Sequence, residues 1–337
     1  MLNFDETRYL RIQDAAVAVA ERLGETVHTL RADGLRNVYF LGAGGAGVLM
    51  IPAVQLLQRR AQVEAYLENA AEIVTVGSER LGTGSLAVVP SLSGTTAEAL
   101  AVARYAKECG GTVLALVGDA SAPLADVADI VFEVPAADDT SSESFYVQSL
   151  GLALSILRDE GRCAEYDHII ADLRRLPQAL VAAKEAFEPM ARRVAETIAA
   201  DGYHIITGAG PLWTQAWYYG TCILEEMQWI RTRPIHASDF FHGTLELVEK
   251  NVSVIVLAGP DATRPLAERV LAWAPTVSDA VTLLDVAAFE LPGVSPTTRD
   301  LIPHVVAAAL LERVSAHLEV IRDHPLTTRR YYRRLAY

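Results

Sequence analysis

The chain has 337 residues, which is long for one domain and predicts two. It holds 29 basic and 42 acidic residues, and the resulting net charge of −13 argues against a nucleic-acid-binding surface, which is normally basic. The charge does not exclude an anionic substrate, because a phosphate site needs only local N–H groups and hydroxyls.

With 51% hydrophobic and 21% charged residues, the composition is that of a folded globular protein. No apolar run reaches about 18 residues, so no membrane span is expected. The N-terminal sequence MLNFDETRYL lacks the apolar stretch of a signal peptide, so a cytoplasmic location is expected by default. The three cysteines have no CxxC spacing, which predicts neither a disulfide framework nor a zinc site.

Residues 1–30 have the apolar spacing of a helix. After them, short apolar runs alternate with helical stretches, and the first two runs end in glycine-rich or hydroxyl-rich turns. The expected strands lie at residues 38–41, 86–90, 112–117 and 129–134, and the expected helices at residues 47–59 and 97–109. Strands that alternate with helices predict a parallel sheet that is covered on both faces.

Residues 144–200 lack this alternation and are expected to form long helices with a break at Pro177. Strand-type runs then return, so the second half resembles the first and predicts an internal repeat of two α/β units. The expected strands of this half lie at residues 204–207, 252–258 and 280–286, and a helix follows at 303–322. The chain closes with a tail rich in arginine and tyrosine, HPLTTRRYYRRLAY, whose fold the sequence does not indicate.

The first candidate site is the sequence SLSGTTAE at residues 91–98, where a strand ends and a helix begins. Its hydroxyls and the unpaired N–H groups of a helix N-terminus favour an anion site. The structural alternative is a hydroxyl N-cap with a capping-box Glu98. The density of hydroxyls and the glycine turn at 42–45 favour the anion site, since open α/β sheets bind ligands at the carboxyl ends of their strands.

The glycine turn admits a second interpretation, because its spacing Gly42-x-Gly44-x-x-Gly47 is that of a dinucleotide loop. Such a loop needs an acid about 20 residues further on, and Glu64 and Glu68 lie near that position. This interpretation is the weaker one, because the hydroxyl-rich loop offers a better use for the turn.

The second candidate site combines Glu226, in the stretch Cys222–Ile230, with His242 in the sequence FFHG. A carboxylate among apolar side chains is suited to act as a base near neutral pH, and histidine is suited to acid–base work. The structural alternatives are a solvated face for Glu225 and a packing role for a histidine that follows two phenylalanines.

These motifs resemble those of the sugar isomerase (SIS) domain family. The resemblance rests on SxSGxTxE after a strand, a preceding GxGG turn and duplicated α/β halves, and it covers residues 30–325. The motifs FDETRYL, GAGG with a downstream IPA, EEMQWI, FFHG and HPLTTRRY are more similar still to the fructosamine-6-phosphate deglycases, and with them the resemblance spans nearly the whole chain.

The resemblance implies an α/β protein with two SIS-type three-layer α/β/α domains, each built on a mainly parallel sheet. The expected parts are a helix at 1–30, a first SIS domain with the phosphosugar-binding loop at 31–165, a helical linker at 166–195, a second SIS domain with the catalytic motifs at 196–325, and a tail at 326–337.

The activity that the resemblance implies is cleavage of a 6-phosphofructosyl amine or amino acid to glucose 6-phosphate and a free amine. The phosphate contacts implied are Ser91, Leu92, Ser93, Thr96, Gly44 and Gly45. Glu226 would transfer a proton between C1 and C2, and His242, contributed by a neighbouring subunit as in glucosamine-6-phosphate synthase, would assist ring opening. A homodimer is therefore expected, without metal, cofactor, nucleic acid or membrane as partner.

Some positions depart from the family's pattern. Ala46 stands where many SIS enzymes have a phosphate-binding serine, and Ile223 and Glu143 stand where the synthase has lysines. The tail has arginines but no lysine, whereas the synthase uses a tail lysine in ring opening. These differences suit a substrate that already carries its nitrogen, and Glu143 and Ser141 are candidate contacts to the substrate amine.

Two further functions remain open at this point. An aldose–ketose isomerase or an aminosugar-phosphate deaminase would use the same glutamate and histidine for the same proton shift. A non-catalytic phosphosugar sensor is disfavoured, because about 30 residues before the first strand are too few for a DNA-binding domain. The amine is also open, with lysine, aspartate, asparagine, glutamine and ammonia as candidates.

Overall fold

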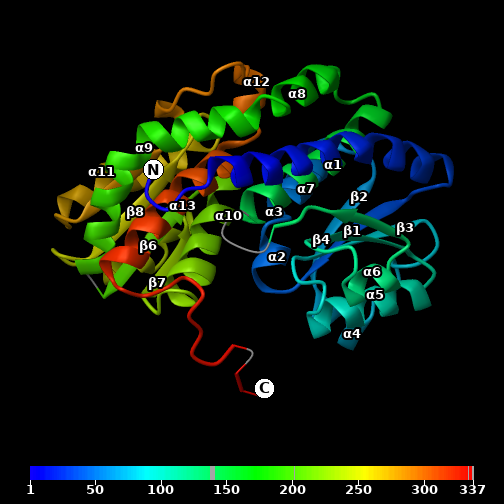
Figure 1. Ribbon diagram of the computed structural model, residues 1–337, viewed down its shortest axis with the longest axis horizontal. Coiled ribbons are helices and arrows are strands. Elements are labelled where there is room, and N and C mark those ends of the chain that lie inside the picture. Colours follow the sequence, from blue (N-terminus) through cyan, green and yellow to red (C-terminus); the bar gives the residue numbers. More distant parts are fainter. Residues whose placement is uncertain (137–140, 201, 333, 336–337) are drawn as a thin grey trace. The chain divides into compact units, whose positions relative to one another are not determined.

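The computed structural model describes residues 1–136, 141–200, 202–332 and 334–335, and the side chain of Ser141 lies outside this description. The chain forms two compact units (Figure 1). We call residues Glu6–Pro177 the N-terminal unit, and Met1–Asp5 together with Gln178–Tyr337 the C-terminal unit. The chain therefore passes between the units twice, after Asp5 and after Pro177.

The N-terminal unit is built on a five-stranded sheet with the order β2-β1-β3-β4-β5, in which every pair is parallel. The strands are β1 (Asn37–Gly42), β2 (Glu64–Asn69), β3 (Ser85–Ser91), β4 (Thr112–Val117) and β5 (Ile130–Glu133). Every residue of β1 and β3 is buried, because helices cover both faces of the sheet.

The helices of this unit are α1 (Glu6–Ala32), α2 (Gly44–Val48), α3 (Ile51–Arg60), α4 (Ala70–Val76), α5 (Ala97–Glu108), α6 (Pro123–Val127), α7 (Ser141–Asp159) and α8 (Tyr166–Leu173). Buried side chains of α4, α5 and α6 pack on one face of the sheet, against residues such as Tyr39, Val89 and Ala115. Figure 1 shows α1 and α7 on the opposite face, which makes the unit a three-layer α/β/α sandwich.

The C-terminal unit holds a four-stranded parallel sheet with the order β7-β6-β8-β9. Its strands are β6 (Tyr203–Gly208), β7 (Arg231–His236), β8 (Ser253–Ala258) and β9 (Val281–Asp285). Its α-helices are α9 (Leu176–Ala200), α10 (Pro211–Tyr218), α11 (Arg264–Trp273), α12 (Pro296–Arg299) and α13 (Pro303–Ile321). Short turns complete it: the π-helix η1 (Tyr219–Glu225) and the 3₁₀ helices η2 (Asp239–Phe241), η3 (Thr244–Leu247), η4 (Ala274–Thr276) and η5 (Val286–Ala288).

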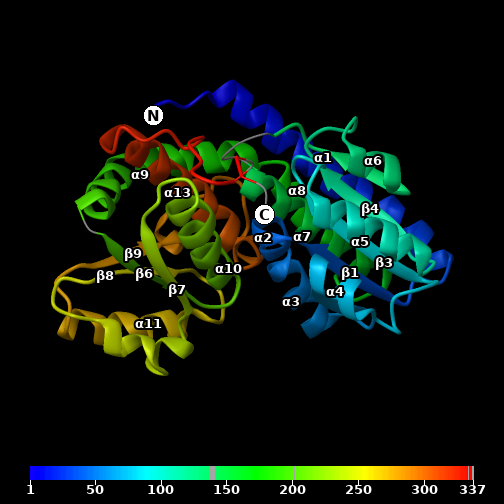
Figure 2. The ribbon, with the colours of Figure 1, turned by 90° about the horizontal axis from the view of Figure 1, so that it is seen from below.

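The core of this unit lies between the sheet and its helices. Val254 and Val256 of β8 pack with Phe240, Ala267 and Val270 on the face that α11 covers. Figure 2 shows α13 on the other face, and nearly every residue of α13 up to Leu318 is buried. The two sheets repeat one strand order, with β6 to β9 in the places of β1 to β4. The predictions of an α/β fold and of two similar parallel-sheet halves are confirmed.

The structure differs from the predicted elements in two respects. The helix expected at 47–59 is two helices, α2 and α3, and the edge strands β2 and β7 were not predicted as strands. The helix expected at 1–30 is α1, which belongs to the N-terminal unit, and the chain enters the C-terminal unit within the stretch 166–195 that was expected as a linker.

Candidate active site

The turn between β1 and α2 depends on glycine. A side chain on Gly42 would place its Cβ 2.2 Å from the Cα atom of Gly47, so the strand end and the helix approach too closely for any other residue. Gly44 has a φ of +53°, and it begins α2 without any side-chain cap on the helix. Gly44 is exposed and Gly45 is partly buried, so both backbone groups lie at the surface of the N-terminal unit.

The loop at 91–96 gathers its hydroxyls at the carboxyl end of β3. Ser91 is buried at the strand end, and its Oγ donates to Oγ1 of Thr96 at 3.4 Å. Oγ1 of Thr95 donates to Oγ of Ser93 at 3.0 Å. Gly94, with a φ of +59°, turns the backbone between these pairs, and its N–H donates to the carbonyl of Ser91 at 3.0 Å. Three of the predicted phosphate contacts, Ser91, Ser93 and Thr96, therefore lie in one compact loop.

The predicted contact Leu92 belongs to the same loop, where its carbonyl accepts the N–H of Gly118 at 2.9 Å. Thr96 is the N-cap of the 12-residue helix α5, yet its side chain makes no capping hydrogen bond. Among the described residues the capping alternative is therefore not found, and the N–H groups in the first turn of α5 can donate to another acceptor. A helix dipole adds a partial positive charge at this point, which favours an anion.

Glu226 ends the π-helix η1 in the C-terminal unit. The expectation that it lies among apolar side chains is wrong, because its side chain is 41% exposed. The apolar residues just before it face inward, whereas Glu226 stands on the turn that leads to β7. Its Oε1 accepts a hydrogen bond from Nε of Arg329 at 3.0 Å, so the glutamate forms an ion pair with the C-terminal tail.

A pocket of about 680 Å³ opens beside Glu226 within the C-terminal unit. It combines two carboxylates, three arginines and four aromatic side chains. The lining residues are Tyr203, Glu225, Glu226, Trp229, Ile230, Arg231, Thr232, Arg329, Arg330, Tyr331 and Tyr332. The tail, whose fold the sequence does not indicate, contributes four of these residues and so forms one wall of the pocket.

The neighbouring Glu225 is occupied by local structure. Its Oε1 accepts hydrogen bonds from the hydroxyl of Thr232 at 2.6 Å and from the backbone N–H of Thr232 at 3.3 Å. Burial raises the pKa of the Cys222 thiol to about 12, so this cysteine stays protonated and is not a nucleophile near neutral pH. Of the groups in this segment, Glu226 has the most suitable position for proton transfer.

His242 follows η2 in an exposed turn, and its N–H donates to the carbonyl of Asp239 at 2.9 Å. Among the described residues it does not belong to the lining of the Glu226 pocket. In the described part of a single chain, Glu226 and His242 therefore do not line this pocket together. Gly243, with a φ of +131°, follows in open space and terminates the turn.

Glu143 is fully buried in α7, where its Oε1 accepts a hydrogen bond from the hydroxyl of Tyr9 at 3.1 Å. This contact lies inside the N-terminal unit and was not predicted from the sequence. Ser141, the other candidate amine contact, has its side chain outside the described residues. Both assignments stay predictions.

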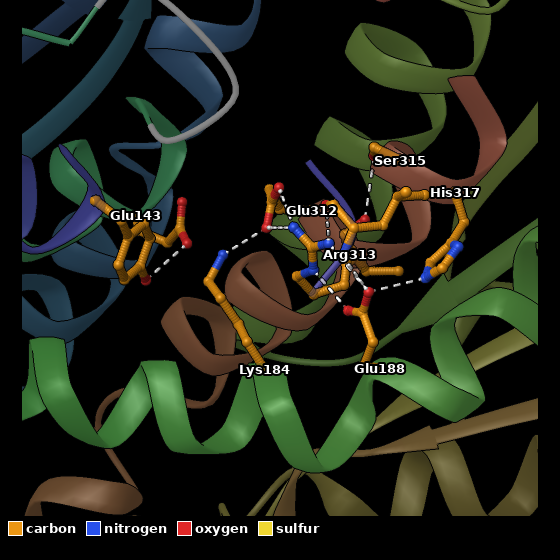
Figure 3. Close-up of polar contacts among 10 residues, drawn as sticks. Glu143, Lys184, Glu188, Glu312, Arg313, Ser315 and His317 are labelled. Atoms are coloured by element: carbon orange, nitrogen blue, oxygen red, sulfur yellow. Dashed lines mark hydrogen bonds and ion pairs between the residues drawn. The ribbon is translucent and has the colours of Figure 1, made fainter. Parts of the chain in front are cut away.

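Sequence reasoning also missed a buried ionic cluster in the C-terminal unit (Figure 3). Nζ of Lys184 donates to Glu312 at 2.7 Å, and Arg313 bridges Glu312 at 3.1 Å and Glu188 at 2.8 Å. The cluster holds the start of the chain, because Glu188 accepts the N–H of Leu2 at 2.7 Å and Arg313 donates to the Leu2 carbonyl. From the sequence alone, these charged side chains would be predicted to face solvent, because only the fold shows that they are buried.

Burial opposes the ionised form of Glu188, but hydrogen bonds from Arg313 and from the N–H of Leu2 outweigh it and lower the pKa of Glu188 to about 2. The cluster lies away from the Glu226 pocket lining and has a structural role. Among the described residues, no group of histidine, cysteine and acidic side chains has the arrangement of a metal site. In the same part of the chain, no helix combines the length and apolarity that a bilayer crossing needs.

Residues 35–158 match the model of the SIS domain family. Residues 35–158 therefore form a SIS domain. The matched segment contains both the glycine turn and the 91–96 loop, so the predicted anion site belongs to the SIS domain.

Two curated relatives resemble this chain over most of its length. Fructosamine deglycase FrlB of Bacillus subtilis is 26% identical over 331 residues, which cover 97% of this chain and 100% of the relative. Fructoselysine 6-phosphate deglycase of Escherichia coli O157:H7 is 25% identical over 91% of this chain and 89% of its own. Both resemblances extend over the C-terminal unit as well as the SIS segment.

The crystal structure of a Bacillus subtilis protein assigned as a phosphosugar isomerase superposes with a TM-score of 0.88 at 26% identity, and covers 96% of this chain and 99% of the other. These likenesses extend beyond the SIS domain at residues 35–158 to nearly the whole chain.

Proposed function

We propose that the chain is a deglycase that cleaves a 6-phosphofructosyl amine or amino acid into glucose 6-phosphate and the free amine. The observation that carries the proposal is the pocket of the C-terminal unit, in which Glu226 presents a partly exposed carboxylate beside the tail. The names of the Bacillus and Escherichia relatives support the same activity and, in the second case, a phosphorylated substrate.

In this proposal the 91–96 loop binds the 6-phosphate. The hydroxyls of Ser91, Ser93 and Thr96 donate to its oxygens, and the N–H groups at the start of α5 and in the glycine turn add further donors. Leu92, Gly44 and Gly45 contribute backbone groups to the same binding. A phosphate held in this way fixes the position of the sugar and converts the later steps to intramolecular ones.

The chemistry assigned to Glu226 is a proton transfer between neighbouring carbons. Its carboxylate removes a proton from C1 of the 1-amino-1-deoxyketose, the C1–H electrons form the C1=C2 double bond, and the C2 carbonyl oxygen takes up a proton from solvent, which gives an enaminol. Return of the first proton to C2, with loss of the N–H proton to solvent, gives the imine of the aldose. Water then adds to C1, the C1–N bond breaks, and glucose 6-phosphate and the amine leave. No electrons are exchanged with an external reagent, so the scheme balances without a redox partner.

The proposal gives His242 the opening of the sugar ring, and places this histidine in the site of a neighbouring subunit of a homodimer. Its exposed position on the turn after η2 supports this assignment, because a residue that serves a second chain must stand at the surface. Glu143 and Ser141 are proposed, at the level of the sequence pattern, as contacts to the amine of the substrate.

The decisive experiment measures glucose 6-phosphate released from a panel of 6-phosphofructosyl amino acids and simple amines. Fructose 6-phosphate and glucosamine 6-phosphate serve as the alternative substrates. Release from the Amadori phosphates is the expected result and identifies the amine. Turnover of the alternative substrates alone would move the protein to the isomerases or deaminases, and tight binding without turnover would indicate a sensor.

The substitution Glu226→Gln tests the base in the same assay. It keeps the size of the side chain and removes the proton acceptor, so kcat should fall by at least about 100-fold while the binding of glucose 6-phosphate is retained. Glu225→Gln is the matched control, since Glu225 is engaged by Thr232 and is assigned no proton. Near-normal turnover of Glu226→Gln would show that another group is the base.

A further inference from the structure

The C-terminal tail is held firmly against the turn that carries Glu226. Nε2 of the buried Gln228 donates to the carbonyl of His324 at 2.7 Å, and Arg322 donates to the carbonyl of Gln228 at 3.3 Å. The ring of Trp229 packs edge-on against His324, with 4.4 Å between the ring centroids. The path of the tail past residues 226–229 is therefore fixed by several independent contacts.

The tail is fixed on its other side as well. The N–H of Leu326 donates to Oε1 of Glu319 on α13 at 2.9 Å. The guanidinium of Arg330 lies over the ring of Trp229, 4.1 Å from its centroid. Segment 322–330 thus spans from α13 to the pocket as an ordered strap.

Within this strap, the guanidinium of Arg329 has a set orientation. Its Nη1 donates to the carbonyls of Leu326 at 2.6 Å and Thr328 at 3.0 Å, which are both in the tail itself. These bonds hold the guanidinium so that its Nε–H donates to Oε1 of Glu226 at 3.0 Å. Arg329 is only 19% exposed, so water competes weakly for this donor.

The pair leaves half of the glutamate available. Among the residues that the structure describes, Oε1 of Glu226 receives the Arg329 bond and Oε2 receives none. Oε2 therefore remains available for a proton, while Oε1 is held in place. A carboxylate at the end of three rotatable bonds and 41% exposed would otherwise sample several rotamers.

We propose that Arg329 is a positioning residue that orients the Glu226 carboxylate for proton transfer, and that the tail holds Arg329 beside Glu226. This inference rests on the proposed function of Glu226 as the base. Arg329 acts through Glu226 and takes no proton itself. Its benefit lies in a pre-organised geometry, because a misplacement of about 1 Å can cost about 100-fold in rate.

The same pair contributes little to folding. A partly exposed ion pair adds little to the free energy of unfolding, so the protein should fold without it. Loss of Arg329 is therefore expected to change catalysis without unfolding the chain, and the two effects can be measured separately.

The test compares Arg329→Ala, Arg329→Lys and the control Arg334→Ala in the full-length protein, with the best substrate of the panel. Arg334 is an exposed arginine of the same tail outside the pocket lining. For Arg329→Ala, kcat should fall about 10- to 100-fold with KM within about twofold of wild type. Lysine should restore part of kcat, and millimolar guanidinium should restore part of it in the alanine variant but have no such effect on Arg334→Ala.

Crystal structures of wild type and Arg329→Ala provide a second measurement that needs no activity. Glu226 should adopt one rotamer in the wild type and several in the variant. A single shared rotamer would overturn the proposal even for a protein that is inactive on every compound, whereas that inactivity itself would count against the proposed function. A rise in KM at constant kcat, an unchanged kcat, or a loss that neither lysine nor guanidinium repairs would also overturn it.

Discussion

At the scale of single residues, Gly94 decides the shape of the proposed phosphate loop. Its φ of +59° lies in the left-handed region, and a Cβ there would come within 2.4 Å of the Cβ of Ala122. The loop thus combines a backbone conformation and a close packing contact that only glycine satisfies together. The backbone turn at Gly94 therefore sets the positions of the hydroxyl-bearing residues before and after it.

Gly94→Ala should therefore lower both stability and phosphate affinity. Backbone strain and the steric clash together predict a loss of about 1–3 kcal/mol in the free energy of unfolding, measured by chemical denaturation. Glucose 6-phosphate binding, measured by calorimetry, should weaken in parallel. Gly202→Ala is the control, because a Cβ at Gly202 meets no atom within 4 Å. Equal stability of the two variants would contradict this account of the loop.

Protonation of Glu188 should lower the stability of the protein in acid. Its pKa is about 2 in the folded protein against an ordinary value of 4.5, so folding favours its ionised form. The stabilisation is complete above about pH 4.5 and is lost as the pH falls towards 2. Arg313, His317 and the N–H of Leu2 are the partners that supply it.

A comparison with Glu188→Gln checks this pH dependence. Between pH 4.5 and pH 2, the free energy of unfolding of the wild type should fall more steeply than that of the variant, when both are measured in urea. The two curves should approach each other at the acid end, where the wild-type carboxylate is also neutral. Parallel curves across the whole range would refute the low pKa of Glu188.

At the scale of elements, the sequence predicted the central strands and the apolar edge strands β5 and β9, but not the edge strands β2 and β7. The strands β1, β3 and β8 are buried along their whole length, and each contains a continuous apolar run of at least four residues, VYFL, LAVV and VIVLA respectively. The edge strands β2 (EAYLEN) and β7 (RTRPIH) face solvent for much of their length and carry charges. Their strand conformation comes from pairing with β1 and β6 rather than from an apolar pattern.

In the candidate site, too, the sequence predicted only what neighbouring residues determine. The hydroxyl loop could be placed from local sequence, because strand, loop and helix are contiguous. The environment of Glu226 could not, since its partner Arg329 lies 103 residues further along the chain. The burial of Lys184 and Arg313 was likewise invisible, because charged residues at helical spacing look like a solvated face until the packing of α9 against α13 is known.

At the scale of the whole molecule, the two units share a strand order but carry different candidate functional residues. The N-terminal unit carries the hydroxyl loop after β3, whereas the C-terminal unit carries Glu226 just before β7. Through His242, the proposed catalysis also draws on a second chain. The question of which chain supplies His242 can be answered without a structure of the dimer.

A subunit-complementation experiment answers it. Glu226→Gln and His242→Ala should each be inactive alone, and unfolding and refolding them together as an equal mixture should restore about a quarter of wild-type activity. The reason is combinatorial: half of the dimers are mixed, and each mixed dimer has one site with both native residues. If His242 serves its own chain, every site in the mixture keeps one substitution and no activity returns.

The anchoring of the chain start has a consequence for biosynthesis. Leu2 hydrogen-bonds to Arg313, which lies 311 residues later, so during synthesis the segment that contains Leu2 must wait for α13 before it can dock. At elongation rates of about 5–20 residues per second, that wait lasts roughly 15–60 s. The C-terminal unit therefore closes only after α13 has been made, and a nascent chain stalled before α13 would leave Glu188 without its arginine and the segment around Leu2 open to proteases.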